Sequence, residues 1–364
     1  MKVTFPHMGN IYIPIESLVQ GMGHDVVVPP MDTKRTLDLG TKYSPDTTCL
    51  PFKIIVGNLI EGIDLGADCV LMAGGTGPCR LGYYGEVHKG ILEDLGKKVE
   101  FITIEPPRGN NPNFWPQLGK LFEKTNLKRF AGGCLLAWAK LNACEELELL
   151  ALVVRPRERE FGSTSRLLKQ AFQQIKKAQS LSAVGKLREE SVHAVKGLMS
   201  TSEKEKVLRV GLVGEIYTVL EPFVNLQIEE RLGYLGVEVY RTISLVDWVK
   251  NHIFKQGIGL RIDQALRRSA AGYLRGFVGG HGLETVARTV DLAEKDYAGA
   301  IHILPMTCMP EIVAQAILPQ ISEDKHIPVL SLVVDEHTGE AGFQTRLEAF
   351  VDLLHRRERC RILG

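Results

Sequence analysis

Short apolar runs alternate with segments of helical hydrophobic spacing along most of the chain. Such alternation is typical of βαβ units, in which helices cover both faces of a buried parallel sheet. In the N-terminal part, the pattern predicts strands at 3–5, 24–28, 68–72 and 99–104, and helices at 14–22, 52–65 and 85–95. We therefore expect a first α/β domain over residues 1–112.

The strand pattern largely disappears between residues 113 and 205, where runs of helix-forming residues take over, as at 134–152 and 165–187. The alternation then returns and predicts strands at 207–213, 237–241, 299–304 and 329–334, and helices at 222–235, 282–295 and 310–321. The sequence thus predicts two Rossmann-like α/β domains, each with a doubly wound and mainly parallel sheet, joined by a helical insert or linker. The second α/β domain spans residues 206–364 and resembles the first in rhythm.

The charge balance excludes some classes of function. Among 364 residues, 44 Lys and Arg stand against 43 Asp and Glu, so almost no net field attracts nucleic acid or an anionic membrane. The N-terminus has no basic region followed by a long apolar stretch, and nowhere do eighteen apolar residues run together. We therefore expect a cytoplasmic protein that is neither secreted nor inserted into a membrane. Its seven cysteines are expected to be reduced, because their number is odd and an export signal is lacking.

Three of these cysteines are predicted to lie where strands or loops lead into helices. Cys49 precedes a proline that suits the first turn of a helix, and Cys308 lies between a predicted strand and the helix that Pro310 begins. Cys79 lies in the glycine-rich loop 73–84, which follows a buried strand. Open α/β sheets bind ligands at the carboxyl ends of their strands, and a helix N-terminus favours the thiolate form of cysteine.

The other cysteines have ordinary structural interpretations. Cys69 falls within a buried strand, Cys134 and Cys144 point to different faces of one predicted helix, and Cys360 belongs to a charged tail. The three selected cysteines are 30 and 229 residues apart, which excludes a zinc ribbon or a ferredoxin-type run. What remains is a long-range site of three thiolates for iron–sulfur, zinc or copper(I), with one position open. The alternative is that all three are buried loop residues without a ligand.

Other residues are candidates for binding or proton transfer. Glu215 follows a predicted strand and a G-x-x-G turn, so it is placed for acid/base chemistry, for hydrogen-bonding a ligand or for capping the next element. His281, within a glycine-rich loop, is a second candidate proton donor, with a polar loop role as the alternative. His337 follows the last predicted strand and is a further candidate proton donor, or a metal ligand together with Asp335 and Glu336. No i, i+4 histidine pair supports such a metal site, so we favour a loop or capping role for His337.

The residues beside the selected cysteines are candidates for holding a cofactor or an anion. Glycine is over-represented at 36 residues, and the excess lies in loops after apolar strands, which indicates that a ligand approaches the backbone closely, as at Gly77. Arg80 and Lys53 are placed to offset the charge of a thiolate cluster or to hold an anionic substrate. Their alternative role is that of exposed loop cations.

Three stretches of the chain resemble a known superfamily. They are GGTGPCRLGYYGEVHKGILEDLG at 74–96, VGLVGEIYTVLEPFVNLQIEERLG at 210–233, and the segment 303–354, which begins ILPMTCMPEIVAQAILPQ. They resemble the 2-hydroxyacyl-CoA dehydratase and benzoyl-CoA reductase superfamily, and most closely its branch of acyl-CoA dehydratase activase-related proteins, near the double-cubane cluster proteins. The resemblance covers nearly the whole chain and is strongest from about residue 205 onward.

The resemblance implies a cytoplasmic iron–sulfur protein of strict anaerobes with Rossmann-like domains. Its three cluster cysteines correspond to Cys49, Cys79 and Cys308, and they would hold a [4Fe–4S] cluster in each chain or share an [8Fe–9S] double cubane between two chains. The implied partners are a second copy in a homodimer, a small-molecule substrate and a separate ATP-hydrolysing activase that donates electrons. No segment clearly matches the acyl-CoA-binding part of the dehydratases, which leaves a CoA ester in doubt as the substrate.

Three functions are therefore open at the level of the sequence. The first is an oxygen-sensitive reductase or dehydratase-like enzyme that uses low-potential electrons at the cluster. The second is a carrier or electron relay that holds a cluster but transforms no substrate. The third is a nucleotide- or CoA-binding α/β protein whose cysteines are structural.

Overall fold

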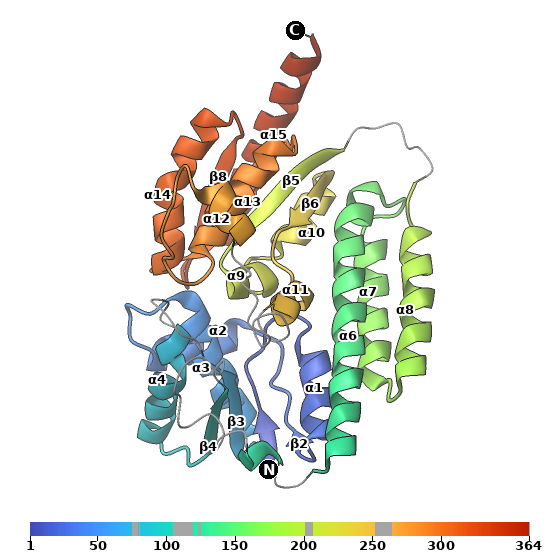
Figure 1. Ribbon diagram of the computed structural model, residues 1–364, viewed down its shortest axis with the longest axis vertical. Coiled ribbons are helices and arrows are strands. Elements are labelled where there is room, and N and C mark those ends of the chain that lie inside the picture. Colours follow the sequence, from blue (N-terminus) through green and yellow to red (C-terminus); the bar gives the residue numbers. More distant parts are fainter. Residues whose placement is uncertain are drawn as a thin grey trace. The chain divides into compact units, whose positions relative to one another are not determined.

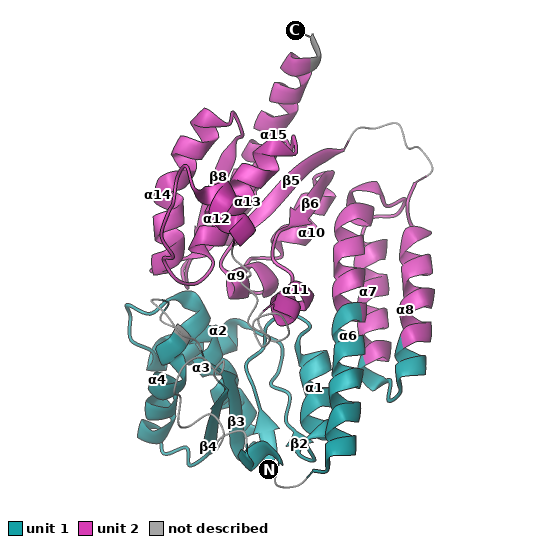
Figure 2. Ribbon diagram, in the orientation of Figure 1, with its two compact units in different colours: residues 1–142, 176–184 teal, residues 143–175, 185–364 magenta. Residues whose placement is uncertain are grey.

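The computed structural model describes residues 1–74, 79, 81–104, 119–122, 125–200, 207–251 and 264–363 (Figure 1). The chain divides into two compact units, residues 1–142 with 176–184 and residues 143–175 with 185–364 (Figure 2). Each unit contains one four-stranded parallel sheet flanked by helices, which confirms the predicted α/β class with two Rossmann-like domains. None of the helices in the described ranges is long and apolar enough to cross a lipid bilayer.

The first unit is built on a sheet in the order β2-β1-β3-β4. Its strands are β1 Lys2–Thr4, β2 Asp25–Val26, β3 Cys69–Ala73 and β4 Glu100–Ile104, and its helices include α1 Tyr12–Gly21, α2 Lys34–Tyr43, α3 Leu50–Asp64 and α4 Leu81–Asp94. Val3, Cys69 and Ile102, from three neighbouring strands, are fully buried together in one core. Parallel strands whose faces are both covered in this way explain the continuous apolar runs of the sequence.

Helices α2 and α3 pack almost backbone to backbone. A Cβ atom at Gly57 would lie 2.0 Å from the carbonyl oxygen of Thr36, and one at Gly40 would lie 1.8 Å from that of Lys53. Only glycine fits at such separations, so these two residues set the distance between the helices. The contact fixes the position of α3, and one of the candidate cysteines, Cys49, is the N-cap of this helix.

The second unit has the same strand order as the first, β6-β5-β7-β8. Its strands are β5 Leu208–Gly214, β6 Val237–Arg241, β7 Gly299–Pro305 and β8 Val329–Val334. Its helices include α9 Ile216–Leu220, α10 Ile228–Tyr234, α11 Leu245–Val249, α12 Gln264–Ala270, α13 Gly282–Glu294, α14 Met309–Asp324 and α15 Glu340–Leu363. Gly214 ends β5 with φ +146°, and a Cβ there would lie 1.9 Å from the Ile303 carbonyl oxygen, so the close pairing of β5 with β7 requires glycine.

The middle of the chain is helical, as the sequence predicts. It contains α6 Leu127–Val154, the short 3₁₀ helix η1 Arg155–Arg157, α7 Ser163–Lys177 and α8 Leu181–Lys196, and the three long helices run side by side (Figure 1). The division into two units passes through all three of them. Lys140 of α6 is almost fully buried, and its ammonium donates to the carbonyl oxygen of Lys176 in the last turn of α7, at 2.8 Å. A cation at the C-terminal end of a helix is favoured by the helix dipole.

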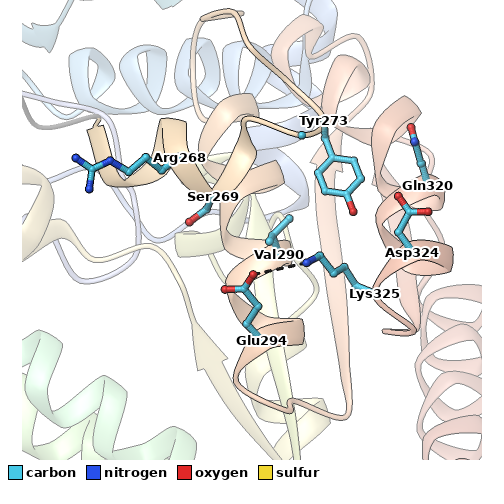
Figure 3. A pocket seen from close by; sticks show the side chains of 9 residues that line it. Arg268, Ser269, Tyr273, Val290, Glu294, Gln320, Asp324 and Lys325 are labelled. Carbon is cyan, nitrogen blue, oxygen red and sulfur yellow. Dashed lines mark ion pairs between the residues drawn. The ribbon is translucent and has the colours of Figure 1, made fainter.

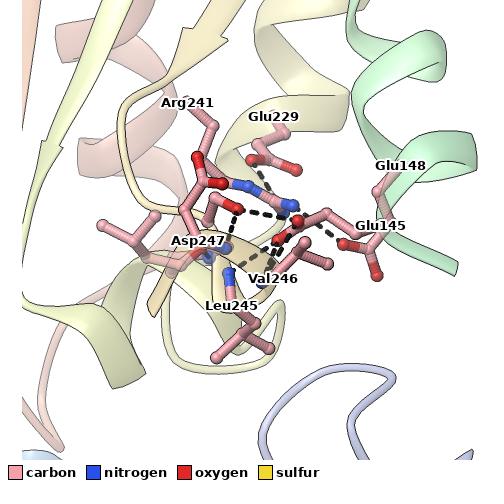
Figure 4. A network of polar contacts seen from close by, with 10 residues as sticks. Glu145, Glu148, Glu229, Arg241, Leu245, Val246 and Asp247 are labelled. Carbon is pink, nitrogen blue, oxygen red and sulfur yellow. Dashed lines mark hydrogen bonds and ion pairs between the residues drawn. The ribbon is translucent and has the colours of Figure 1, made fainter. Parts of the chain in front are cut away.

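A buried ionic network connects α6 with the end of β6 in the second unit (Figure 4). The Arg241 guanidinium is 2.9 Å from the Glu148 carboxylate and 3.5 Å from that of Glu229. Next to it, the Glu145 carboxylate accepts hydrogen bonds from the main-chain N–H of Leu245 and the hydroxyl of Ser244, at 2.6 and 2.7 Å. Glu145 therefore caps α11 from a distant part of the sequence.

Two predicted helices differ in the structure: one is divided and the other is shorter. The helix predicted at 165–187 is α7 followed by α8, because the Ser180 hydroxyl accepts from the Ala183 N–H and begins a new helix. The helix predicted at 222–235 is replaced by α10 alone, preceded by Leu226 and Gln227 with φ of 54° and 57°. A left-handed pair of residues interrupts helical hydrogen bonding, and no glycine marks it in the sequence.

Candidate functional site

The two units place corresponding helix starts at the carboxyl edges of their sheets. In each sheet the third strand in sequence order, β3 or β7, follows one helix and precedes another. Helices that connect parallel strands run antiparallel to them, so α3, α4, α13 and α14 all begin at the edge where the strands end. Ligands of open α/β sheets bind at this edge.

Four of the candidate residues lie at these helix starts. Cys49 is the N-cap of α3, His281 is the N-cap of α13, and Cys308 is the N-cap of α14. Cys79 lies two residues before α4, and its carbonyl oxygen accepts from the Gly82 N–H at 3.4 Å. Cys49 and His281 therefore occupy topologically equivalent positions in the two units, and so do Cys79 and Cys308.

The Cys49 side chain faces an aromatic cluster. Its thiol makes no cap hydrogen bond to α3 and instead contacts the phenolic hydroxyl of Tyr84, on α4. Phe52, one turn along α3, packs edge-on against the Tyr84 ring with 4.9 Å between ring centroids. Cys49 is 8% exposed and Tyr84 7%. The prediction that 73–84 forms a loop is wrong at its end, because α4 begins at Leu81 and includes Tyr84.

His88 completes this cluster one turn further along α4. Its ring lies 4.2 Å from Phe52 between centroids, and its Nδ1 atom lies 3.4 Å from the Met72 sulfur. Burial lowers the pKa of His88 to about 3, because the charged imidazolium would lose its water. The residue is therefore neutral at physiological pH.

We expect His88 to make the first unit less stable in acid. The pKa in the unfolded chain is about 6.5, so the unfolded state gains a proton below that pH while the folded state gains it only near pH 3. The free energy of unfolding should thus fall as the pH drops from 6.5 toward 3, by about 2 kcal/mol at pH 5 from this residue alone. Urea unfolding of the metal-free protein at pH 7 and pH 5 measures the effect.

The control for this prediction is an exposed histidine. His88→Leu should lose most of the extra acid sensitivity, whereas His355→Gln, on the exposed side of α15, should retain it. Equal pH dependence in His88→Leu and the unmodified protein would show that His88 is not the source.

Of the three predicted cofactor-binding residues, the structure describes Lys53 only. Lys53 is not an exposed loop cation, because it lies in the first turn of α3, is 2% exposed, and its ammonium is 3.4 Å from the Asp46 carbonyl oxygen. A buried ammonium one turn after Cys49 is suited to offsetting thiolate charge. Gly77 and Arg80 lie outside the described residues.

Near Cys308, the N-cap of α14, the structure contains a buried pair of a carboxylate and an imidazole that the sequence did not indicate. Glu311, in the first turn of α14, is fully buried, and its Oε2 atom lies 2.9 Å from both the Thr285 hydroxyl and the His302 Nε2 atom. The Nδ1 atom of His302 lies 3.3 Å from the Ser331 hydroxyl. The position of Glu311 directly after a strand-to-helix junction was a sequence signal for a functional acid. His302, inside the apolar strand β7, gave no such signal.

Glu215 caps a helix and also has an altered acidity. Both of its carboxylate oxygens are engaged, with the Tyr217 N–H at 3.0 Å and with the Thr218 N–H and hydroxyl at 2.8 Å. Burial raises the pKa of Glu215, and these donors and the charge of His281 oppose the increase. The predicted capping role is therefore confirmed, and the raised pKa is compatible with proton donation.

The remaining predicted residues have structural surroundings. Cys69 is fully buried in β3, where burial raises the pKa of its thiol to about 12 and makes it inert. Cys360 is exposed on α15. The main-chain N–H of His337 donates to the Asp335 carboxylate at 3.0 Å, so His337 lies in a loop after β8, as its loop interpretation expects.

A hollow of about 410 Å³ lies among helices α12, α13 and α14 of the second unit (Figure 3). It is lined by Tyr273 and by the C-terminal ends of α13 and α14, including Asp324. At these helix ends the Lys325 ammonium is 3.6 Å from the Glu294 carboxylate. Since Cys308 is the N-cap of α14 and Asp324 is its last residue, the hollow is at the opposite end of this helix from the candidate cysteine.

Within the described part of the chain, no group of three or more His, Cys, Asp or Glu residues is close enough to hold a metal ion. Cys49 and Cys79 belong to the first unit and Cys308 to the second. No protein-family model matches the sequence, and no curated protein matches it significantly.

Proposed function

We propose that the chain is a cytoplasmic iron–sulfur protein whose cluster is held by Cys49, Cys79 and Cys308. The observation that carries this proposal is the placement of these thiols, each at a helix start on the carboxyl edge of one of two equivalent sheets. The partial positive charge of a helix N-terminus stabilises the thiolate that binds metal. The cluster is [4Fe–4S] in each chain or an [8Fe–9S] double cubane shared by two chains of a homodimer.

The proposed reaction is a low-potential reduction, or a reductive dehydration, of a small molecule. A separate ATP-hydrolysing activase donates the electrons, and the bound cluster supplies low-potential electrons and one open coordination position. Glu215, with its raised pKa, and His281, at the start of α13, supply protons at the edge of the second sheet. Lys53 offsets negative charge one turn after Cys49.

One observation favours a second function, that of an electron relay without a substrate. Both carboxylate oxygens of Glu215 are already engaged in capping α9, so proton delivery would have to break existing hydrogen bonds. Turnover with a strong reductant and small reducible molecules separates the two functions, because a relay changes its redox state without consuming substrate.

The deciding experiment is the content of iron and acid-labile sulfide in anaerobically purified protein, with absorption and EPR spectra before and after reduction. We expect about four irons per chain with nearly equal sulfide, which fits either cluster type. A chain that takes up no iron on anaerobic reconstitution would overturn the proposal and favour a plain nucleotide- or CoA-binding protein.

A further inference from the structure

The hydroxyl of Tyr84 contacts the thiol of Cys49 across two neighbouring helices of the first unit. A phenol is a hydrogen-bond donor, and a thiolate is an acceptor only. Once Cys49 is ionised, the hydroxyl can therefore take only one role in this contact, that of the donor. A hydrogen bond to an ionised acceptor is stronger than one between neutral groups.

The aromatic cluster holds the Tyr84 ring in this orientation. Phe52 packs edge-on against it at 84°, and His88, one turn along α4, lies 5.5 Å away between centroids. Because the lowered pKa of His88 keeps its ring uncharged, His88 contributes packing and no positive charge beside Tyr84. The Tyr84 hydroxyl is thus the polar group that this cluster directs at the sulfur.

We propose that Tyr84 is a positioning residue that raises the reduction potential of the cluster through its hydrogen bond to the Cys49 sulfur. This inference rests on the proposed role of Cys49 as a ligand. Reduction adds negative charge to the cluster and its sulfur ligands, and a donor aimed at one of these sulfurs stabilises the reduced state. Removing the donor should therefore make the cluster harder to reduce.

The test is Tyr84→Phe, which keeps the ring and removes the hydroxyl. We expect the variant to bind iron and sulfide as the unmodified protein does, with a midpoint potential shifted to more negative values in an EPR-monitored redox titration. Tyr83→Phe is the matched control, since Tyr83 is the preceding residue on α4 and is 74% exposed. Its potential should not change.

A second variant strengthens the donor instead of removing it. Fluorotyrosine at position 84 keeps the ring and has a more acidic hydroxyl, so it should shift the potential in the positive direction. If Tyr84→Phe fails to retain its cluster, the fluorotyrosine variant still tests whether the Tyr84 hydroxyl affects the reduction potential. Full iron content with an unchanged potential in either variant overturns the role of Tyr84. Absence of a cluster in the unmodified protein overturns the proposed function itself, and this inference with it.

Discussion

Replacing Cys308 by Ala is expected to abolish cluster binding, and iron and acid-labile sulfide per chain should fall close to zero. Cys49→Ala and Cys79→Ala should have the same effect. With three protein thiolates as ligands, the loss of one leaves a site that cannot retain a low-potential cluster during purification. Iron and sulfide analysis of the anaerobically reconstituted variants, with their EPR spectra, measures the loss.

Cys69→Ala is the matched control, since Cys69 is a fully buried thiol in the first unit with no role in the site. It should retain iron at the level of the unmodified protein. Full cluster retention in Cys79→Ala would refute the ligand assignment. Retention in Cys308→Ala alone would show that the ligands come from the first unit only, because Cys308 belongs to the second.

The helix starts at Cys49 and Cys308 were predictable from the sequence for a local reason. In both segments a proline follows the cysteine within two residues, and proline fits the first turn of a helix, where its missing N–H is not needed. The buried parallel strands were predictable for the same kind of reason, because short continuous apolar runs lie between helical patterns. The similar rhythm of the two halves of the chain corresponds to two sheets with the same strand order.

The contacts around these cysteines were not predictable, because they join residues that are distant in sequence. The glycine-rich run before Tyr84 predicts a loop there, whereas Tyr84 lies in α4, and its contact with Cys49 spans 35 positions. Glu145 caps a helix about 100 positions away. Hydrophobic periodicity shows which face of an element is buried, but it does not show which polar group on a neighbouring element meets that face.

The pairing of the buried Glu311 and His302 also could not be predicted from the sequence. Each residue lies in an otherwise apolar setting, and a lone histidine in a strand gives no sequence signal of its partner. Their hydrogen bond at 2.9 Å depends on α14 folding back over β7. The pairing is thus a consequence of the strand-to-helix connection and is visible only once that connection is known.

The second large effect is expected from Arg241→Ala, which should lower the free energy of unfolding by about 3–5 kcal/mol. The Arg241 side chain is 4% exposed and compensates the carboxylates of Glu148 and Glu229, from α6 and α10. Burial already raises the pKa of Glu229, and the charge of Arg241 opposes this increase. Without the guanidinium, both carboxylates lose the arginine with which they pair in a largely buried site, so thermal unfolding followed by circular dichroism should show a clearly lower midpoint.

Two further variants distinguish lost compensation from lost packing. Arg361→Ala removes an exposed ion pair with Asp296 and should leave the midpoint unchanged, because solvent screens such a pair. Adding Glu148→Gln and Glu229→Gln to Arg241→Ala removes the two carboxylate charges that Arg241 pairs with and should recover part of the stability. If the triple variant is no more stable than Arg241→Ala alone, the arginine stabilises the protein through the packing of its side chain and not through its ion pairs with the two glutamates.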